Sequence, residues 1–313
     1  LAAQGMAVSV VELAAHVLPP LEREVAHDVE VELRGLGIAV HTGVPATAIE
    51  AVADHALIRL GNGTTIATDL VVLSVGVRPD TGFLASSGIA LERGAIVVDE
   101  HGRTNLDGVW AVGDAVISRH AVTGVRRPVA LAGPANRAGR QVADDIVRPG
   151  SARPLPAPVG TAVVRIGALT IAMTGANREE LERAGIAFHT LHLHPNQHAG
   201  YFPGAKQLHL VVHVASDDAC LLGAQAIGPD GVAKRIDVLA TAIRAGLRVT
   251  DLIDLDLAYA PPYGQAKDAV NLVGMVGANV LDGTLRLWYA QQLDQVQGSA
   301  LLLDVRSATE VAT

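Results

Sequence analysis

The sequence predicts an α/β protein that continues into an α+β domain, and the order of its elements is the main observation behind this fold class. Up to residue 150, short apolar strand-like segments alternate with helical patterns, as in layered α/β domains. From 159 to about 287 the order becomes strands, helix, strands and helices, which favours an α+β domain. Half of the 313 residues are apolar and only 3% are aromatic, which suits packed α/β layers.

Composition and charge exclude several classes of function. The net charge is −8 and no basic run occurs, which argues against nucleic-acid binding. No apolar stretch approaches the ~20 residues of a membrane-spanning helix, and no segment is typical of a signal peptide. The single cysteine, Cys220, rules out an internal disulfide framework. We therefore expect a cytoplasmic protein without nucleic-acid or membrane partners.

The first expected domain, residues 1–76, alternates strands with a helix. Apolar side chains with a helical period follow Pro19 and Pro20, and Gly37 is expected to end this helix. The expected strands are 6–11, 38–41, 47–52, 57–60, 64–67 and 70–75, of which the last is apolar enough to be covered on both faces. This order is typical of the second half of a nucleotide-binding domain.

Glu12, which follows the first of these strands, extends that interpretation. In a dinucleotide-binding βαβ unit an acidic residue binds the adenosine ribose about 20 residues after a glycine-rich turn. Such a turn would precede Leu1, and a new apolar strand begins at Leu301, shortly before the sequence stops. We therefore expect the sequence to be an internal piece of a longer protein. The alternative for Glu12 is a solvated strand end.

The second expected domain, residues 77–150, contains a strand at 109–112 that ends in Gly113 and Asp114. Glycine lets the backbone approach a ligand closely, and a carboxylate at the carboxyl end of a strand can accept hydrogen bonds from ligand hydroxyls. This pattern therefore predicts a ligand-binding turn. The alternative is a buried strand that ends in an ordinary Gly-Asp turn.

A proline-rich linker is expected to separate this domain from the last one. Residues 148–158 contain four prolines among eleven positions. Before the linker, a helix is expected to begin at Gly133 and Pro134. After it, we expect strands at 162–166, 169–173, 187–192, 208–213 and 221–227 and helices at 178–184 and 232–245. The charges of Lys234–Asp237 are expected on a helix surface or an interface.

Five segments carry a specific family resemblance. They are Thr104–Asp114, Arg127–Arg140, His194–Ala205, Gly231–Leu239 and Tyr259–Asp268. In this order they resemble the flavin-dependent pyridine nucleotide-disulfide oxidoreductases, in the branch with coenzyme A-disulfide reductase and the NADH oxidases and peroxidases. The resemblance covers Leu1 to about Leu287.

The resemblance implies a division of the chain into four parts. Residues 1–76 would be the C-terminal part of a Rossmann-like NAD-binding domain, and 77–150 that of an FAD-binding domain. Residues 159–287 would form an α+β dimerisation domain, and 288–313 a linker. Within that linker, Leu301–Glu310 resembles the first strand of a rhodanese domain, and the alternative is an isolated strand that enters a linker.

The resemblance also implies FAD as a cofactor. Asp114, placed by Gly113, would accept a hydrogen bond from the ribityl chain. The segment Leu131, Ala132 and Gly133 would lie against the flavin ring, where backbone N–H groups at a helix start favour negative charge. The alternative for this segment is an ordinary helix that starts with a proline.

The second implied cofactor is NADH, or NADPH. Glu12 would accept hydrogen bonds from both ribose hydroxyls and would repel a 2′-phosphate, which favours NADH. Ala130 would lie near the nicotinamide. Gly76 begins a segment that resembles the family's turn beside the nicotinamide half, although Asp80 stands where asparagine is usual.

For catalysis, the resemblance implies Tyr201 and Tyr263, which would reach the partner subunit's active site in a homodimer. There a phenol could donate a proton or a hydrogen bond to the departing thiolate of a small disulfide substrate. His198, beside Tyr201, is a candidate for orienting the substrate. Phe202 replaces a second tyrosine that is common in this loop. The alternative for either tyrosine is an interface or core residue.

The family passes electrons from NADH through flavin to a cysteine, which would lie upstream of Leu1. Cys220 stands where the family carries an apolar residue, so we expect a small buried hydrophobe there. No cysteine or carboxylate cluster with ligand spacing accompanies the histidines of residues 189–213, so no metal site is expected.

Three functions therefore remain open. The first is an FAD- and NAD(P)H-dependent disulfide reductase that acts on coenzyme A disulfide, a persulfide or a related thiol. The second is an NADH oxidase or peroxidase of the same fold. The third, for the isolated piece, is a non-catalytic dimerisation module, because the piece lacks the glycine-rich turns and the redox cysteine and is expected to be inactive alone.

Overall fold

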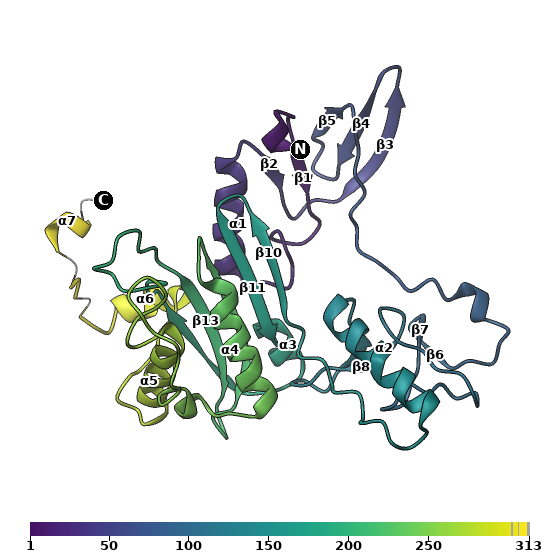
Figure 1. Ribbon diagram of the computed structural model, residues 1–313. Coiled ribbons are helices and arrows are strands. Elements are labelled where there is room, and N and C mark those ends of the chain that lie inside the picture. Colours follow the sequence, from purple (N-terminus) through teal and green to yellow (C-terminus); the bar gives the residue numbers. More distant parts are fainter. Residues whose placement is uncertain (302, 306, 312–313) are drawn as a thin grey trace.

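The computed structural model describes residues 1–301, 303–305 and 307–311, which form three parts (Figure 1). A five-stranded sheet with its helices is the largest part. The N-terminal strands and helix α1 lie beside this sheet, and a smaller lobe around helix α2 lies to one side (Figure 1).

The N-terminal part is built on a β-α-β unit. Strands β1 (Ser9–Val11) and β2 (Ala39–His41) pair in parallel, and α1 (Arg23–Gly35) connects them. Helix α1 buries Val25 and Val29, which lie four residues apart and therefore share a face. A short 3-10 helix, η1 (Ala2–Gln4), precedes this unit, and an antiparallel sheet of β3 (Ala46–Val52), β4 (His55–Leu60) and β5 (Thr65–Thr68) follows it.

The strand that we expected at 70–75 does not form. Residues 70–80 contain no helix or strand, and the side chain of Val75 is 90% exposed. A strand requires a neighbour for its backbone hydrogen bonds, and none of the described strands pairs with this segment. The apolar composition therefore predicted the wrong structure in this chain.

The lobe around α2 contains two small hairpins. These are β6 (Leu91–Glu92) with β7 (Ala95–Ile96), and β8 (Ile117–Arg119) with β9 (Arg126–Pro128). The lobe also contains the 3-10 helix η2 (Gly82–Leu84) and the long helix α2 (Ala132–Val147), which begins one residue before the position expected.

The strand that we expected at 109–112 is also absent. Trp110 makes only an isolated bridge to Arg103. The Thr104 amide donates to the Val109 carbonyl at 2.9 Å, and the Ala111 amide donates to the Gly102 carbonyl at 2.9 Å. The segment is therefore paired with a loop, which does not offer the regular neighbour that a strand needs.

The third part agrees closely with expectation. Its strands form one antiparallel sheet in the order β10-β11-β14-β13-β12. They are β10 (Ala162–Ile166), β11 (Leu169–Gly175), β12 (Phe188–Leu193), β13 (His209–Ala215) and β14 (Leu221–Gly228). The helices are α3 (Arg178–Arg183), α4 (Val232–Ala245), η3 (Val249–Leu252) and α5 (Ala269–Leu281).

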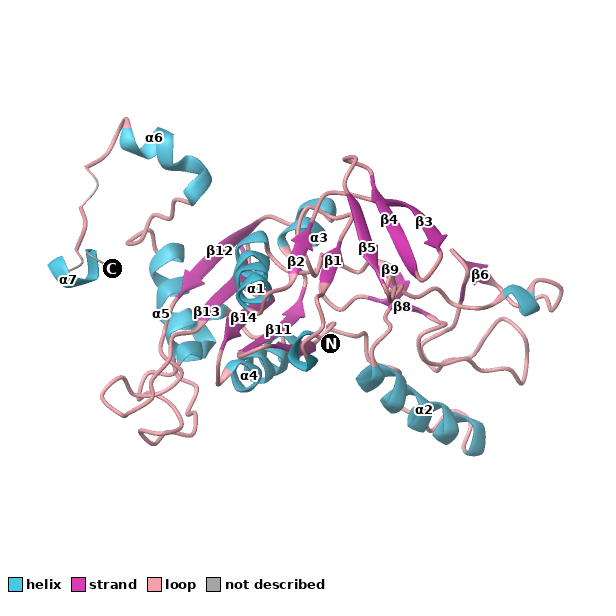
Figure 2. Cartoon of the chain, turned by 90° about the horizontal axis from the view of Figure 1, so that it is seen from above, coloured by secondary structure: helices cyan, strands magenta, loops and turns pink. Residues whose placement is uncertain are grey.

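The two faces of this sheet are covered by different helices. Leu210 and Val212 of β13 belong to the core formed with α4 and α5, whereas Val211 packs with Val25 and Val29 of α1. Figure 2 shows α1 and α4 on opposite sides of the strands. Because side chains alternate along a strand, His209 and His213 share the α1 face with Val211, and these polar residues need partners there.

The C-terminal residues form only short helices. They are η4 (Ala290–Gln292), α6 (Leu293–Gln297) and α7 (Ala308–Val311). The apolar strand expected from Leu301 does not form: Leu303 is 77% exposed, and none of the described strands pairs with this segment. Leu302 and Arg306, which belong to that prediction, lie outside the described residues.

Candidate functional site

The turn with Gly113 and Asp114 lies beside the start of α2. Gly113 has a φ of 89°, a conformation that side chains rarely adopt, and Asp114 is exposed. A cavity of about 400 Å³ is lined by Gly113, Pro134 and Ala135 among others. The first amides of α2 have no partner within the helix, and its N-cap residue, Leu131, gives no side-chain hydrogen bond to them. This corner therefore suits a ligand with hydrogen-bond acceptors or negative charge.

A partly buried ion pair ties the segment before this turn to α2. Asp145 of α2 accepts two hydrogen bonds from Arg103, both at 2.7 Å, and one from the Trp110 indole at 3.0 Å. These hydrogen bonds, from Arg103 first, hold the pKa of the Asp145 carboxyl at about 2. Because Trp110 lies four residues before Asp114, the ion pair helps to position the turn.

The residues expected near NADH lie in three separate segments of the chain. Glu12 is half-buried after β1, and its carboxylate accepts from the Ala14 amide at 2.8 Å. It therefore stands at the carboxyl end of a parallel strand pair, where nucleotides bind in α/β folds. Gly76 has a φ of 90° in an exposed segment, and Ala130 is exposed just before α2.

The tyrosines lie on neighbouring loops of the third part. Tyr201 is 78% exposed, and its hydroxyl lies 3.2 Å from that of Tyr259. This hydrogen bond raises the pKa of Tyr259. Tyr263 is also exposed and follows a turn in which its amide donates to the Ala260 carbonyl at 2.9 Å. The loops that carry the predicted Tyr201 and Tyr263 thus lie in one region, together with Tyr259, which no sequence pattern singled out.

His198 lies beneath these loops. It is 7% exposed, its Nδ1 lies 3.0 Å from the Ala199 carbonyl oxygen, and its ring packs edge-on against Phe202 at 5.6 Å. In this arrangement His198 supports the loop that carries Tyr201. Its predicted role in orienting the substrate stays a prediction.

Arg235 differs from our expectation of a surface or interface charge. It is 1% exposed and donates to Asp268 and to backbone carbonyls of two loops. The helical period places position 235 on the buried face of α4, three residues after Val232 and four before Leu239. Lys234 lies off this face and is half-exposed, so the period, rather than the charge, separates the two residues.

Glu22 is a second buried charge that sequence patterns did not reveal. It is 5% exposed and accepts from His213 Nε2 at 2.9 Å, from the Arg178 amide at 2.7 Å and from Arg178 Nε at 3.1 Å. Its own amide donates to the Gln225 side chain at 2.7 Å. Glu22 therefore connects the start of α1 to the sheet of the third part.

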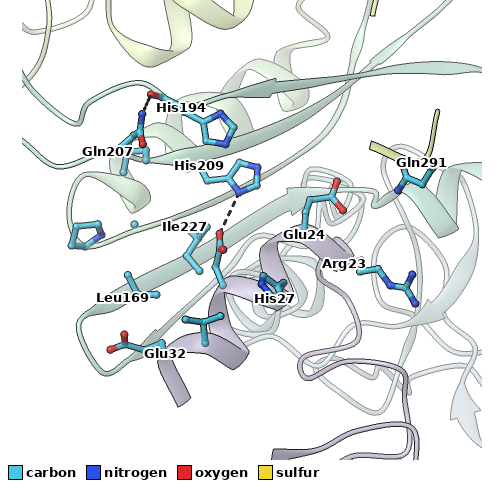
Figure 3. Close-up of a pocket in the computed structure, with 15 residues that line it drawn as sticks. Arg23, Glu24, His27, Glu32, Leu169, His194, Gln207, His209, Ile227 and Gln291 are labelled. Carbon is cyan, nitrogen blue, oxygen red and sulfur yellow. Dashed lines mark hydrogen bonds and ion pairs between the residues drawn. The ribbon is translucent and has the colours of Figure 1, made fainter. Parts of the chain in front are cut away.

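A polar cavity of about 790 Å³ continues along this contact (Figure 3). His194 and His209 stack there with ring centroids 4.6 Å apart, and His209 Nδ1 lies 3.3 Å from Asp28 of α1. Burial lowers the pKa of His194, and the neighbouring His209 adds to this effect. Within the described residues, no three histidine, cysteine or carboxylate side chains are arranged to hold a metal ion.

Cys220 lies directly before β14 and is half-buried rather than fully buried as expected. Burial raises the pKa of its thiol, and a hydrogen bond with Asp218 adds to this. A raised pKa keeps the thiol protonated and poorly reactive at neutral pH.

Among the helices of the described residues, none has the length and apolar character needed to cross a bilayer.

Family models match most of the chain. The model described as pyridine nucleotide-disulphide oxidoreductase matches residues 1–139, and that for the dimerisation domain of the same family matches residues 161–270.

Curated relatives of known name match over a shorter part of their own length. Coenzyme A disulfide reductase of Staphylococcus haemolyticus is 33% identical over 233 residues, which cover 72% of this chain and 51% of the relative. Coenzyme A disulfide reductase of a Staphylococcus aureus strain is 34% identical over 207 residues, which cover 66% of this chain and 47% of that relative. The chain thus spans about half the length of these relatives.

Solved structures share the fold of most of this chain. Reduced CoADR-RHD of Bacillus anthracis has a TM-score of 0.93 and 37% identity, covering 99% of this chain and 55% of that protein. A NAD-dependent persulfide reductase from A. fulgidus has a TM-score of 0.88 and 34% identity, covering 93% of this chain and 54% of that protein. A water-forming NADH oxidase from Lactobacillus brevis has a TM-score of 0.85 and 19% identity. The match covers 91% of this chain and 63% of that protein, and it shows a likeness of fold alone.

Proposed function

Because the chain belongs to the pyridine nucleotide-disulphide oxidoreductase family, we propose that the whole protein is a homodimeric, cytoplasmic flavoenzyme that uses FAD and NADH, or NADPH, to reduce a small disulfide or persulfide. Relatives named coenzyme A disulfide reductase and persulfide reductase support this substrate class. The match of residues 161–270 to the family's dimerisation domain supports the homodimer.

The corner at Gly113 and the start of α2 fits a flavin. When bound, FAD would supply the transfer of two electrons from NADH to the disulfide. In this proposal Asp114 accepts a ribityl hydroxyl hydrogen bond, and the uncapped amides at Ala132 and Gly133 face the electron-rich part of the ring. Glu12 accepts hydrogen bonds from the adenosine ribose of NADH.

The observation that carries the substrate step is the hydroxyl pair of Tyr201 and Tyr259. Reduction of a disulfide consumes two electrons and two protons and releases two thiols; NADH supplies a hydride, and one further proton is needed. A phenol can donate that proton to the departing thiolate. An ordinary tyrosine phenol keeps its proton at neutral pH, and the hydrogen bond between the two hydroxyls raises the pKa of Tyr259 further above that range. Tyr263 is exposed on the same loop, four residues after Tyr259, and is the third candidate donor.

An oxidase function lacks comparable support. The likeness to the water-forming NADH oxidase concerns the fold alone. Reduction of oxygen also consumes protons, so the phenol pair alone does not separate the two functions. The relatives at 33% and 34% identity are named for coenzyme A disulfide and persulfide reduction, and these names favour the disulfide or persulfide reductase.

The test separates the two half-reactions of the full-length protein by rapid mixing. We expect Tyr201→Phe, Tyr259→Phe and Tyr263→Phe to slow disulfide turnover about tenfold or more while flavin reduction by NADH stays intact, because a proton donor to the thiolate acts after hydride transfer. Tyr289→Phe is the matched control, since its hydroxyl bonds the backbone of Thr190 instead. Equal effects on both half-reactions, or no effect, would show that the tyrosines are structural.

A further inference from the structure

The two tyrosine loops are joined by their own hydrogen bonds. The Ala199 amide donates to the Pro261 carbonyl at 3.3 Å, and the Gln265 side chain donates to the Asn196 carbonyl at 2.6 Å. Since Tyr201 is 78% exposed and Tyr259 is 47% exposed, packing alone holds these side chains only in part. The position of their hydroxyls therefore depends on how the loops are held from beneath.

Arg235 of α4 holds both loops from the buried side. Its Nη2 donates to the Gln197 carbonyl at 2.7 Å and to Asp268 Oδ2 at 2.8 Å, and its Nε donates to Asp268 Oδ1 at 3.2 Å. Gln197 begins the loop of Tyr201. Asp268 is the N-cap of α5 and ends the loop of Tyr259. One guanidinium thus joins the start of one loop to the end of the other.

The sequence around Arg235 makes room for this arrangement. Gly231 precedes α4 with a φ of 72°, and a Cβ atom there would lie 2.3 Å from Arg235 Nη1 and 3.1 Å from the Gln197 Cβ. Nη1 also donates to the Gly231 carbonyl at 3.2 Å. A side chain at position 231 would therefore displace the guanidinium.

We propose that Arg235 is a positioning residue for disulfide reduction, which sets the separation of the Tyr201 and Tyr259 hydroxyls by fixing Gln197 and Asp268 relative to each other. This inference rests on the proposed function. Arginine is required because its planar head spans a carboxylate and a carbonyl at once, whereas a lysine ammonium is a single point of contact. The neighbouring Lys234 lies 3.7 Å from Asp268 Oδ2 and 3.5 Å from the carbonyls of Ala258 and Tyr263. All three of these contacts are on the Tyr259 side, so Lys234 does not join the two loops.

The first perturbation is Arg235→Lys in the full-length flavoprotein. Lysine keeps the positive charge beside Asp268, so the buried carboxylate is not left unpaired. The loops then lose their common anchor, and misplacement of a reacting group by about 1 Å can cost roughly 100-fold in rate. We expect coenzyme A disulfide turnover to fall tenfold to 100-fold and flavin reduction by NADH to change less than about twofold.

A second variant and a control make the result decisive. Gly231→Ala displaces the guanidinium without removing it and should give the same separation of half-reactions. Arg244→Lys changes an arginine of the same helix that bonds the Ala157 carbonyl at 3.0 Å, away from the tyrosines, and should leave both half-reactions intact.

An ultraviolet titration of the tyrosines gives a readout that does not depend on activity. The hydrogen bond between the Tyr201 and Tyr259 hydroxyls raises the pKa of Tyr259, so Arg235→Lys should lower that pKa to the value found in Tyr201→Phe. A lowered pKa together with selective loss of disulfide turnover supports the positioning role.

A folded Arg235→Lys protein with unchanged turnover and unchanged titration overturns this role and leaves the proposed function standing. If the tyrosine variants themselves have no effect on turnover, the proposed proton donation is wrong. In that case the titration alone decides whether Arg235 positions the pair.

Discussion

Glu22→Gln should destabilise the contact between α1 and the sheet far more than its position at a helix start would indicate. Burial alone would raise the pKa of the Glu22 carboxyl, but the hydrogen bonds and charges of His213 and Arg178 outweigh this and hold it at about 2, against an ordinary value of 4.5. This shift corresponds to about 3 kcal/mol of stability at neutral pH.

The pH dependence follows from the direction of the shift. A carboxyl whose pKa is lowered by folding stabilises the protein fully above its unfolded pKa of 4.5, and this contribution is lost as the pH falls towards 2. The difference between the native protein and Glu22→Gln should therefore be about 3 kcal/mol at pH 7 and about 1 kcal/mol at pH 3.

Urea unfolding at several pH values and one protein concentration measures this difference. Glu24→Gln is the matched control, because Glu24 binds the same Arg178 at 2.9 Å but is 30% exposed, and such pairs contribute about 1 kcal/mol or less. The reasoning is refuted if the two variants lose equal stability at pH 7, or if the Glu22→Gln difference does not shrink towards pH 3.

Three further outcomes are expected. Asp114→Ala should weaken FAD binding by about 1.5–3 kcal/mol, the value of a charge-assisted hydrogen bond, and unchanged flavin retention on gel filtration would contradict the assignment. The full-length protein should have a higher kcat/KM for NADH than for NADPH, and Glu12→Gln should reduce the ratio of these two values. Equal kcat/KM values in the native protein would contradict the role of Glu12 in binding the ribose. Gly223→Ala should lower the free energy of unfolding by at least about 1–3 kcal/mol, because its Cβ would lie 1.9 Å from the Ala176 carbonyl oxygen. Gly139→Ala, in open space on α2, is its control and should be neutral or stabilising in the same urea assay.

The sheet and helices of residues 159–287 could be predicted from sequence because each element carries its own local signals. Helix α4 has the predicted bounds, since Gly246 ends it in a left-handed conformation with a φ of 69°. Strand β10 also has its predicted bounds. Turn residues and apolar periods act over a few neighbours, so no knowledge of the tertiary structure was needed.

The segments at 70–75 and 109–112 show where local signals fail. Both are apolar and β-prone, yet a strand depends on a partner that lies elsewhere in the sequence. The same dependence hid the partners of Tyr259 and Arg235. Nothing within a few residues of either reveals that Tyr259 meets a hydroxyl 58 residues earlier or that Arg235 bonds an aspartate 33 residues later.

Glu22 and Arg235 have a common physical role on opposite faces of the same sheet. Apolar contacts such as those of Val25 and Leu239 hold helices to the sheet, but they are not directional and tolerate sliding. A buried charge with every hydrogen bond made permits one arrangement, because any shift leaves an unpaired charge in a dry environment. Since apolar replacement of a buried ion pair is often neutral for stability, stability alone does not account for the pair of Arg235 and Asp268. The fixed geometry of the tyrosine loops that this pair joins is the more specific reason for it.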